Sequence, residues 1–326
     1  VESATEKTEP DTVTLFNGTL DTFPGEWITS AEDQGERVLR FVKKFHVDKP
    51  VKNAVLYYCG LGYHDAMLNG KTIDVGYAEG STTNHIYAIT NNGTLTITGD
   101  GEMEDGCPWI EHMDHIEHVV LDGGITKIGK EAFYKFDRLE TVDFGDALVE
   151  VGTRAFSGCK DLEYIHLPDS VEIIRAEAFM DCVSLQEFDY PMSWTEAKSN
   201  GSAYDLFRGC ESLTEIVVPE GIEDIPRGAF AGGDCIERVI LPSTLRNIPE
   251  YAFEGCSSLT YCYIPYGVRN IHWLAFAECT ALEEVVLPDS FLHISAAAFL
   301  NCSALTRVKL SRNLQSINEG AFLGCT

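Results

Sequence analysis

The sequence predicts an α/β solenoid of nine stacked repeats behind a smaller β-rich N-terminal region. Two observations predict it, and the first is a Phe that recurs every 23 residues, with one interval of 28. A fixed period of this length is typical of architectures in which each unit packs on the next. The recurring residues are Phe133, Phe156, Phe179, Phe207, Phe230, Phe253, Phe276, Phe299 and Phe322.

The second observation is the regular sequence around each Phe. Ala precedes the Phe in every unit except the fourth, which has Leu206, and the consensus is A-F-x-x-C-x-x-L-x-x-V-x-L-P-x-x-[VL]-x-x-I-x-x-x. The L-x-x-V-x-L segment alternates with a period of two and predicts a short strand. The I-x-x-x-A-F-x-x-C segment has the spacing of one or two helical turns. Neither element can bury its apolar face alone, so the units are expected to stack with their strands parallel.

The consensus A-F-x-x-C-x-x-L-x-x-V-x-L-P resembles the BspA-type leucine-rich repeats of bacterial and some protist cell-surface proteins. Residues 92–103, followed by Pro108-Trp109, are similar to the hairpin and Trp-bearing segment that often precedes the first repeat of these proteins. The resemblance covers residues 86–326 and implies a leucine-rich-repeat solenoid with its parallel sheet on the concave face. It implies less about the ligand, since family members are described as adhesins for host proteins or other cells.

Residues 13–78 have the composition of β-structure, and Asn69-Gly70 predicts a tight hairpin. Residues 27–76 are also similar to part of the β-sandwich accessory domain of bacterial α-L-rhamnosidases. A cap over the first repeat is the role we favour, because solenoids need covered ends. The alternative is carbohydrate binding by aromatic residues such as Trp27, Tyr58 and Tyr63.

The predicted organisation has four parts. They are a disordered tail at 1–12, a β-rich N-terminal domain at 13–90, a hairpin and capping segment at 91–115 and the leucine-rich-repeat domain at 116–326. The chain begins at Val1 with a polar stretch, as a mature N-terminus does after removal of a signal peptide. The longest markedly apolar stretch, 54–63, is about half as long as a membrane-spanning helix. We therefore expect an extracellular or cell-surface location without a membrane span.

Charge and motifs restrict the function further. The chain has 24 Lys plus Arg against 51 Asp plus Glu, a formal charge of −27 that repels nucleic acid. It contains no G-x-S-x-G, P-loop or H-E-x-x-H motif, so we expect neither enzymatic activity nor a cofactor. His112, His115 and His118 have a spacing that could supply metal ligands, but polar residues of a capping turn are the interpretation we prefer.

Eleven cysteines in an exported chain would ordinarily predict disulfides. Seven of them lie three residues after the Phe of their units, at an inward position, so we expect a ladder of buried free thiols. Cys262 takes a core position on a strand, whereas Cys59, Cys107 and Cys235 lie off the ladder and are the candidates for reactive or paired thiols. The ladder consists of Cys159, Cys182, Cys210, Cys256, Cys279, Cys302 and Cys325.

The ligand is expected on the strand face, because L-x-x-V-x-L exposes the residue before the Val and the residue after it. These positions combine an acidic middle with Tyr residues on either side, and exposed aromatics beside charges are typical of binding hot spots. The candidates are Tyr164, His166, Glu187, Asp189, Glu215, Arg238, Tyr261, Tyr263 and Arg307. The five-residue expansion of the fourth unit adds Trp194, either on a ligand-binding surface loop or packed over the solenoid edge.

These features together predict a non-catalytic secreted or cell-surface binding protein, adhesin-like, that binds a protein through the concave face of its repeats. The alternative is a surface protein that binds carbohydrate through the N-terminal region. In both cases the expected partner is an extracellular protein or glycoconjugate and not a nucleic acid.

Overall fold

The computed structural model describes residues 85–195, 197 and 203–325, together with short segments at 5–6, 12–15, 53–56, 66–68, 71–73 and 78–82. The chain forms two compact units, Val1–Leu61 and Gly62–Thr326. The strands of the first unit form a small sheet in which β2 pairs with β1 in antiparallel and with β3 in parallel orientation. They are β1 (Thr5–Glu6), which lies within the predicted tail, β2 (Thr12–Leu15) and β3 (Asn53–Leu56).

The second unit begins with the predicted hairpin. β4 (Ala66–Leu68) and β5 (Lys71–Ile73) pair in antiparallel orientation, with Leu68 opposite Lys71. This register leaves two residues for the connection and confirms the tight hairpin. The predicted strand within 37–47, and the residues Trp27, Tyr58, Cys59 and Tyr63, lie outside the described residues.

An antiparallel hairpin leads directly into the repeats. β6 (Ala78–Ser81), β7 (His85–Ile89) and β8 (Thr94–Glu102) pair in sequence, and β8 then pairs in parallel with β9 (His118–Ile128). The boundary predicted at residue 90 falls in the turn of this hairpin, so β7 belongs to the same sheet as the first repeat. The short 3-10 helix η2 (Ile110–His112) lies between β8 and β9.

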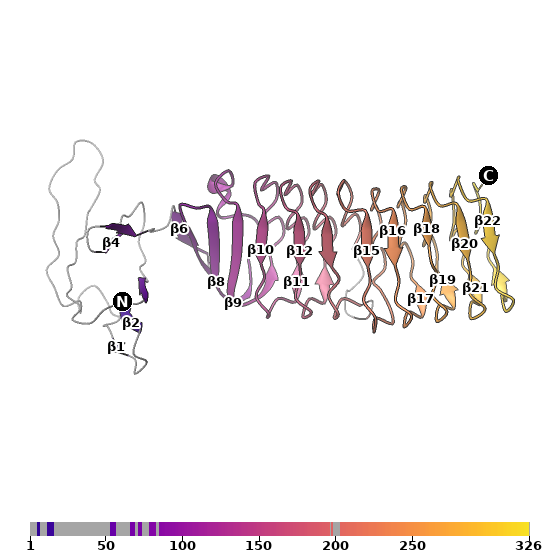
Figure 1. Ribbon diagram of the computed structural model, residues 1–326, viewed down its shortest axis with the longest axis horizontal. Coiled ribbons are helices and arrows are strands. Elements are labelled where there is room, and N and C mark those ends of the chain that lie inside the picture. The colour runs from indigo at the N-terminus through magenta and orange to yellow at the C-terminus, as the bar shows by residue number, and fades with distance from the viewer. Residues whose placement is uncertain are drawn as a thin grey trace. The chain divides into compact units, whose positions relative to one another are not determined.

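The repeats stack with their strands parallel and in register, as predicted (Figure 1). Equivalent residues of successive units face each other, for example Tyr164 and Glu187, or Arg238 and Tyr261. The strands of the longer row, after β9, are β10 (Thr141–Asp143), β12 (Tyr164–His166), β14 (Glu187–Asp189), β15 (Glu215–Val217), β16 (Arg238–Ile240), β18 (Tyr261–Cys262), β20 (Glu284–Val286) and β22 (Arg307–Lys309).

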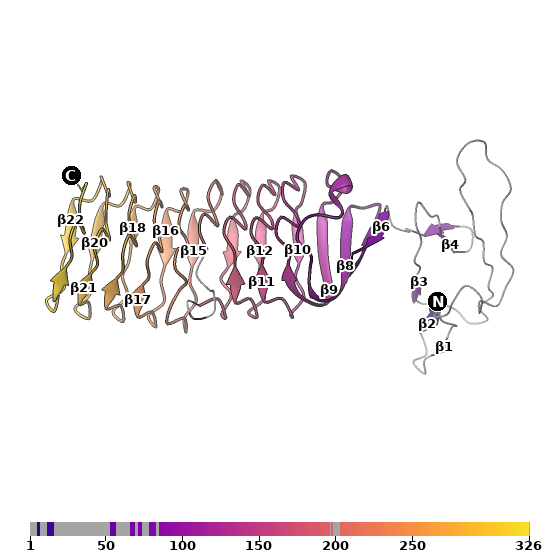
Figure 2. The same ribbon diagram turned by 180° about the vertical axis from the view of Figure 1, so that it is seen from behind.

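A second row of two-residue strands runs beside the first, lower in the view of Figure 2. Their inward residues continue the core, since Ile174, Ile248 and Ile271 are buried. The strands are β11 (Glu150–Val151), β13 (Ile173–Ile174), β17 (Asn247–Ile248), β19 (Asn270–Ile271), β21 (His293–Ile294) and β23 (Ser316–Ile317).

The turn that carries each Phe, called here the Phe turn, is not helical, and the prediction of one or two helical turns is wrong. In every unit the residues two before and two after the Phe have positive φ, as Tyr251 (60°) and Gly255 (73°) do beside Phe253. Left-handed residues at this spacing break an α-helix. The amides of Tyr251, Phe253 and Gly255 instead donate to carbonyls of the next unit, over 2.8 to 3.1 Å.

The core of the solenoid contains stacked Phe rings, and a thiol lies beside seven of the nine repeat Phe residues. Phe253 lies between Phe230 and Phe276, with ring centroids 5.5 and 5.0 Å away. Each ladder cysteine donates its thiol to the carbonyl of the Phe one unit earlier, over 3.0 to 3.2 Å. All ten described cysteines are free thiols, and the predicted buried ladder is confirmed for six of its seven members, since only Cys325 is partly exposed.

The two described cysteines off the ladder are also free. Burial raises the pKa of Cys107 to about 12. Burial also raises the pKa of Cys235, and the neighbouring carboxylate of Asp234 adds to the shift. Both thiols are unpaired, which corrects the pairing alternative. They are less buried than most ladder thiols, and that they react more readily stays a prediction.

Candidate functional site

The strand face is the surface formed by the outward side chains of the longer strand row. Within each unit two side chains point outward, and between paired strands their equivalents lie directly beside them. β14 and β15 lie on either side of the expansion and are not paired. The first row runs Tyr164, Glu187, Glu215, Arg238, Tyr261, Glu284 and Arg307 from β12 to β22. The second row runs His166, Asp189, Val217, Ile240, Tyr263, Val286 and Lys309.

All nine predicted strand-face candidates are exposed and lie in these two rows. The three Tyr residues project well into solvent, with exposed fractions of 41% for Tyr164, 45% for Tyr261 and 60% for Tyr263. Their placement follows from the strand alternation, because the residue between each outward pair is an apolar core residue such as Ile216 or Val239. That these candidates contact a ligand stays a prediction.

The N-terminal part of the strand face is polar and acidic. The Nδ1 atom of His166 lies 2.6 Å from Oδ2 of Asp189, one strand further along. The ring of Tyr164 stacks beside that of His166, with centroids 6.2 Å apart and planes within 4°. Glu187 and Asp189 therefore present two carboxylates side by side at β14, of which Asp189 is held by a ring nitrogen.

The C-terminal part of the strand face carries an apolar patch of Val217, Ile240, Tyr261 and Tyr263, and we include with it Tyr266 of the turn that follows β18. Their exposed fractions range from 37% for Ile240 to 71% for Tyr266. Three of these residues were not among the predicted candidates, namely Val217, Ile240 and Tyr266. The signal that could have identified the first two is the strand alternation itself, since both occupy outward positions where polar residues are usual.

The charged first-row residues beside the patch form ion pairs with one another. Arg238 Nη1 lies 3.2 Å from Oε2 of Glu215, and Arg307 Nη2 lies 3.5 Å from Oε2 of Glu284. Each pair joins equivalent positions of adjacent strands, so each guanidinium is fixed along the first row. The apolar residues of the second row consequently lie beside paired charges.

Trp194 does not belong to the site. Its side chain is fully buried, with ring centroids 6.2 Å from Phe188 and 6.3 Å from Phe230. The hydroxyl of Tyr190 donates to the backbone oxygen of Trp194 over 2.6 Å and holds the turn in place. The surface-loop interpretation is therefore wrong and the packed alternative is confirmed, because the expansion leaves core space that the indole fills.

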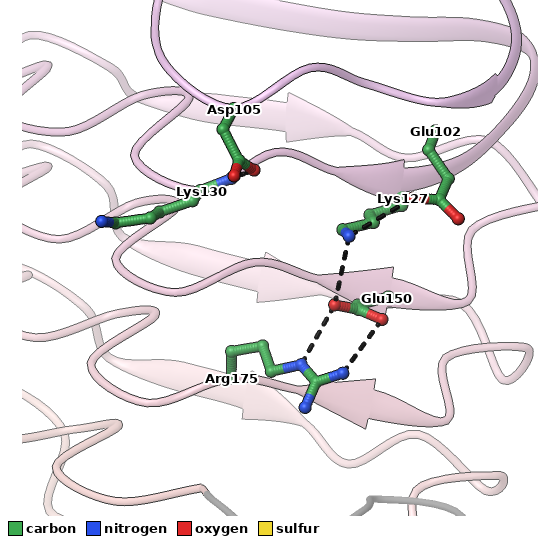
Figure 3. Close-up of polar contacts among 6 residues, drawn as sticks. All are labelled: Glu102, Asp105, Lys127, Lys130, Glu150 and Arg175. Carbon is green, nitrogen blue, oxygen red and sulfur yellow. Dashed lines mark hydrogen bonds and ion pairs between the residues drawn. The ribbon is translucent and has the colours of Figure 1, made fainter.

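A second charged surface crosses the beginning of the short-strand row (Figure 3). Lys127 Nζ lies 3.3 Å from Glu102 and 3.7 Å from Glu150, and Arg175 Nε bonds the same Glu150 at 3.0 Å. Glu150, whose side chain is 17% exposed, thus joins two cations from the strands on either side. Since these charges compensate one another, this surface stabilises the stack and is not our candidate binding face.

The three His residues near the first repeat make separate contacts. His115 Nε2 lies 3.0 Å from the carbonyl oxygen of Thr90, and His118 Nδ1 lies 2.9 Å from Oγ1 of Thr141. Among the described residues, no group of three or more His, Cys, Asp or Glu side chains has the arrangement of a metal site. Within the ranges that the structure describes, no helix has both the length and the apolar character that a bilayer crossing requires.

Comparison with known proteins identifies the repeat. The chain matches the BspA type leucine-rich repeat region, in six copies, over residues 111–232 and 202–326. No curated protein sequence matches it.

Solved structures with similar folds come from several bacteria. A leucine-rich repeat protein of T. pallidum is 25% identical, with 70% of this chain and 91% of that chain covered and a TM-score of 0.40. A leucine-rich cell surface protein of Faecalibacterium prausnitzii is 18% identical, with 72% and 96% covered and a TM-score of 0.38. Because the repeat match extends over well more than half of its residues, the chain belongs to the BspA-type leucine-rich-repeat family.

Proposed function

We propose that the chain is a non-catalytic secreted or cell-surface protein that binds another protein through its strand face, in the manner of an adhesin. The observation that carries the proposal is the apolar patch. Solvated sheet faces usually carry polar residues, and a contiguous exposed apolar surface is typical of an interaction site. Tyr side chains in such a patch supply large contact areas with few rotatable bonds.

The charges of the strand face support a protein partner as well. Polar side chains at the rim of an apolar centre exclude water from the contact and orient the partner. Here Glu187 and Asp189 lie on one side of the patch, and Arg307 and Lys309 lie on the other. A partner with matching charges around an apolar centre would fit this surface, and membership of the family supports a surface or secreted location.

The test uses the full chain on an array of purified extracellular proteins, with the double variant Tyr261→Ala/Tyr263→Ala. Loss of two central aromatic anchors should weaken capture by about 30-fold or more, corresponding to roughly 2 kcal/mol. The matched control is Tyr134→Ala, which removes a Tyr that is 36% exposed but lies in a Phe turn. Equal capture by the double variant and the intact chain would refute the strand face as the binding site.

The same proteins on a glycan array separate the alternative function. Glycan binding that the two Tyr substitutions leave unchanged would place the activity in the N-terminal region and replace the proposed function with carbohydrate recognition. We expect no glycan signal above that of the control surface.

A further inference from the structure

The second row of the strand face has a symmetric order of charges and apolar residues. From β14 to β22 it runs Asp189, Val217, Ile240, Tyr263, Val286 and Lys309. A line between β16 and β18, which are hydrogen-bonded neighbours, divides this row into two halves of three residues. Moving outward from that line, each half has a large apolar residue, then Val, then a charge. The two terminal charges have opposite signs.

We infer that the strand face binds a second copy of this chain across a two-fold axis parallel to the strands, between β16 and β18. This rotation reverses the order of the strands and preserves position along each strand. It places Asp189 of one copy opposite Lys309 of the other, and each contact occurs twice. The inference rests on the proposed function, because it assigns the same face to a protein partner and identifies that partner as the chain itself.

The apolar centre of the second row is complementary under this operation. Val217 meets Val286, and Ile240 meets Tyr263, so aliphatic and aromatic groups face one another throughout the middle. Face-to-face packing of two sheets about 10 Å apart is a common arrangement when both surfaces are apolar. An isologous contact of this kind closes on itself and yields a dimer.

The first row matches in the same register. Glu187 comes opposite Arg307, which adds a second pair of opposite charges beside Asp189 and Lys309. Arg238 comes opposite Tyr261, where a guanidinium can lie over an aromatic ring. Glu215 meets Glu284, two like charges that are already paired with Arg238 and Arg307 within their own chains.

The alternative face-to-face symmetry is unfavourable. A two-fold axis along the solenoid would place each strand over its own copy and exchange the two rows. Glu187 would then face Asp189, and Arg307 would face Lys309, so like charges would meet at both ends. The order of charges therefore selects the arrangement in which the two solenoids run in opposite directions.

The contact is of modest size. The paired strands β15 to β22, about 4.8 Å apart, and the adjacent β14, with roughly 15 Å of strand width, cover on the order of 400 Å² per copy, about half of a standard interface. We therefore expect a weak dimer with a dissociation constant in the micromolar range. Two copies with a formal charge of −27 also repel each other, so the measurement belongs at about 0.15 M salt, where charges beyond about 8 Å are screened.

The test is sedimentation equilibrium of the intact chain and two charge-reversal variants, Asp189→Lys and Lys309→Asp. Each variant alone turns both attractive contacts into repulsive ones, so its dimer should weaken at least 10-fold. An equimolar mixture of the two variants restores both contacts, because at each end a lysine of one variant meets an aspartate of the other. The affinity of the mixture should return to within about 3-fold of the original.

The control is Asp137→Lys, the same change at an exposed residue of a Phe turn, which should leave the dimer unaltered. A chain that stays monomeric at ~0.5 mM, far above the expected dissociation constant, overturns self-association. So does a mixture that associates no better than its components. Neither result affects the proposed function, which is tested by whether the Tyr261→Ala/Tyr263→Ala substitutions weaken capture of an extracellular protein.

Discussion

The Phe turns and the strand face are built from the same nine repeats, yet they vary to very different degrees. In the Phe turns, ring, thiol and backbone amide each contact a fixed position of an adjacent unit, as Phe253, Cys256 and Gly255 do. On the strand face, the equivalent positions range from Asp189 through Ile240 to Lys309. Contact with the neighbouring copy restricts the residue type, whereas contact with solvent leaves it free. The repeat itself therefore does not determine which residues the strand face carries.

The largest expected effect separates these regions by stability. Phe253→Ala removes a ring stacked on both sides within the buried core, and we expect it to lower the free energy of unfolding by about 3–5 kcal/mol. Tyr263→Ala removes an exposed ring and should cost within about 0.5 kcal/mol. Urea denaturation of both variants provides the measurement. Similar losses would show that the strand face contributes to the core as much as the Phe turns do.

The next effect concerns the thiol ladder at alkaline pH. Burial raises the pKa of Cys256 above its ordinary value of 9.0, so above pH 9 the unfolded chain ionises this thiol first. The stability that the neutral thiol contributes is complete below pH 9 and is lost as the pH rises toward the pKa of the folded state. For one buried thiol the loss is about 1.4 kcal/mol per pH unit.

Cys256→Ala tests this loss by removing one ladder thiol. Plotted against pH above 9, the free energy of unfolding of the variant should fall less steeply than that of the intact chain. Cys235→Ala, at a half-buried thiol off the ladder, should change the slope less. Identical slopes for the intact chain and the Cys256→Ala variant would mean that the ladder thiols titrate normally.

The same contrast explains which parts of the structure the sequence could predict. Strand register, the Phe stack and the thiol ladder could be predicted from the 23-residue spacing, because each is formed by residues at fixed positions of adjacent repeats. The helical expectation failed because spacing does not report the sign of φ, and residues such as Tyr251 and Leu274 adopt left-handed conformations without a glycine. Trp194 was ambiguous because an expansion has no equivalent position from which its burial can be inferred.

The strand face was predictable only in part, for a physical reason. Alternation identifies which side chains face outward, so Tyr261 and Tyr263 were found. Binding depends on how neighbouring side chains combine. Val217 and Ile240 form an apolar patch only together with those Tyr residues. The pairing of Arg238 with Glu215 was likewise hidden until the strands were aligned.

A smaller effect on stability should distinguish the two ends of the short-strand row. Equivalent positions carry an ionic contact at one end and a neutral hydrogen bond at the other. Glu150→Gln leaves Lys127 and Arg175 without their shared carboxylate and should cost about 1 kcal/mol. Asn270→Ala removes a neutral bond to Asn247 of 2.6 Å, with a similar expected cost of about 1 kcal/mol. Only the first loss should shrink in about 1 M NaCl, where charges beyond roughly 3 Å are screened. Urea denaturation of both variants with and without the added NaCl measures the two losses. Equal responses to salt would contradict the assignment of the Glu150 contacts as ionic.

The smallest effect arises where the Phe turns bring carboxylates together. Partial burial raises the pKa of Glu254 above 4.5, and Asp205 and Glu278 add to the shift. A raised pKa means that the charged form is disfavoured on folding, so its contribution to stability is lost as the pH rises through the folded pKa. Glu254→Gln should therefore stabilise the chain at pH 7, by less than about 1 kcal/mol because the group is only partly buried.

Thermal unfolding at two pH values tests this sign. The advantage of the Glu254→Gln variant should vanish below pH 4.5, where the carboxyl is protonated in both states. Glu187→Gln is the matched change on the strand face, where the carboxylate is exposed, and should leave the melting temperature unchanged at both pH values. If the two variants behaved alike, the crowding of charges would be no greater in the Phe turns than on the face, and variation along the face would need an explanation other than freedom from neighbouring repeats.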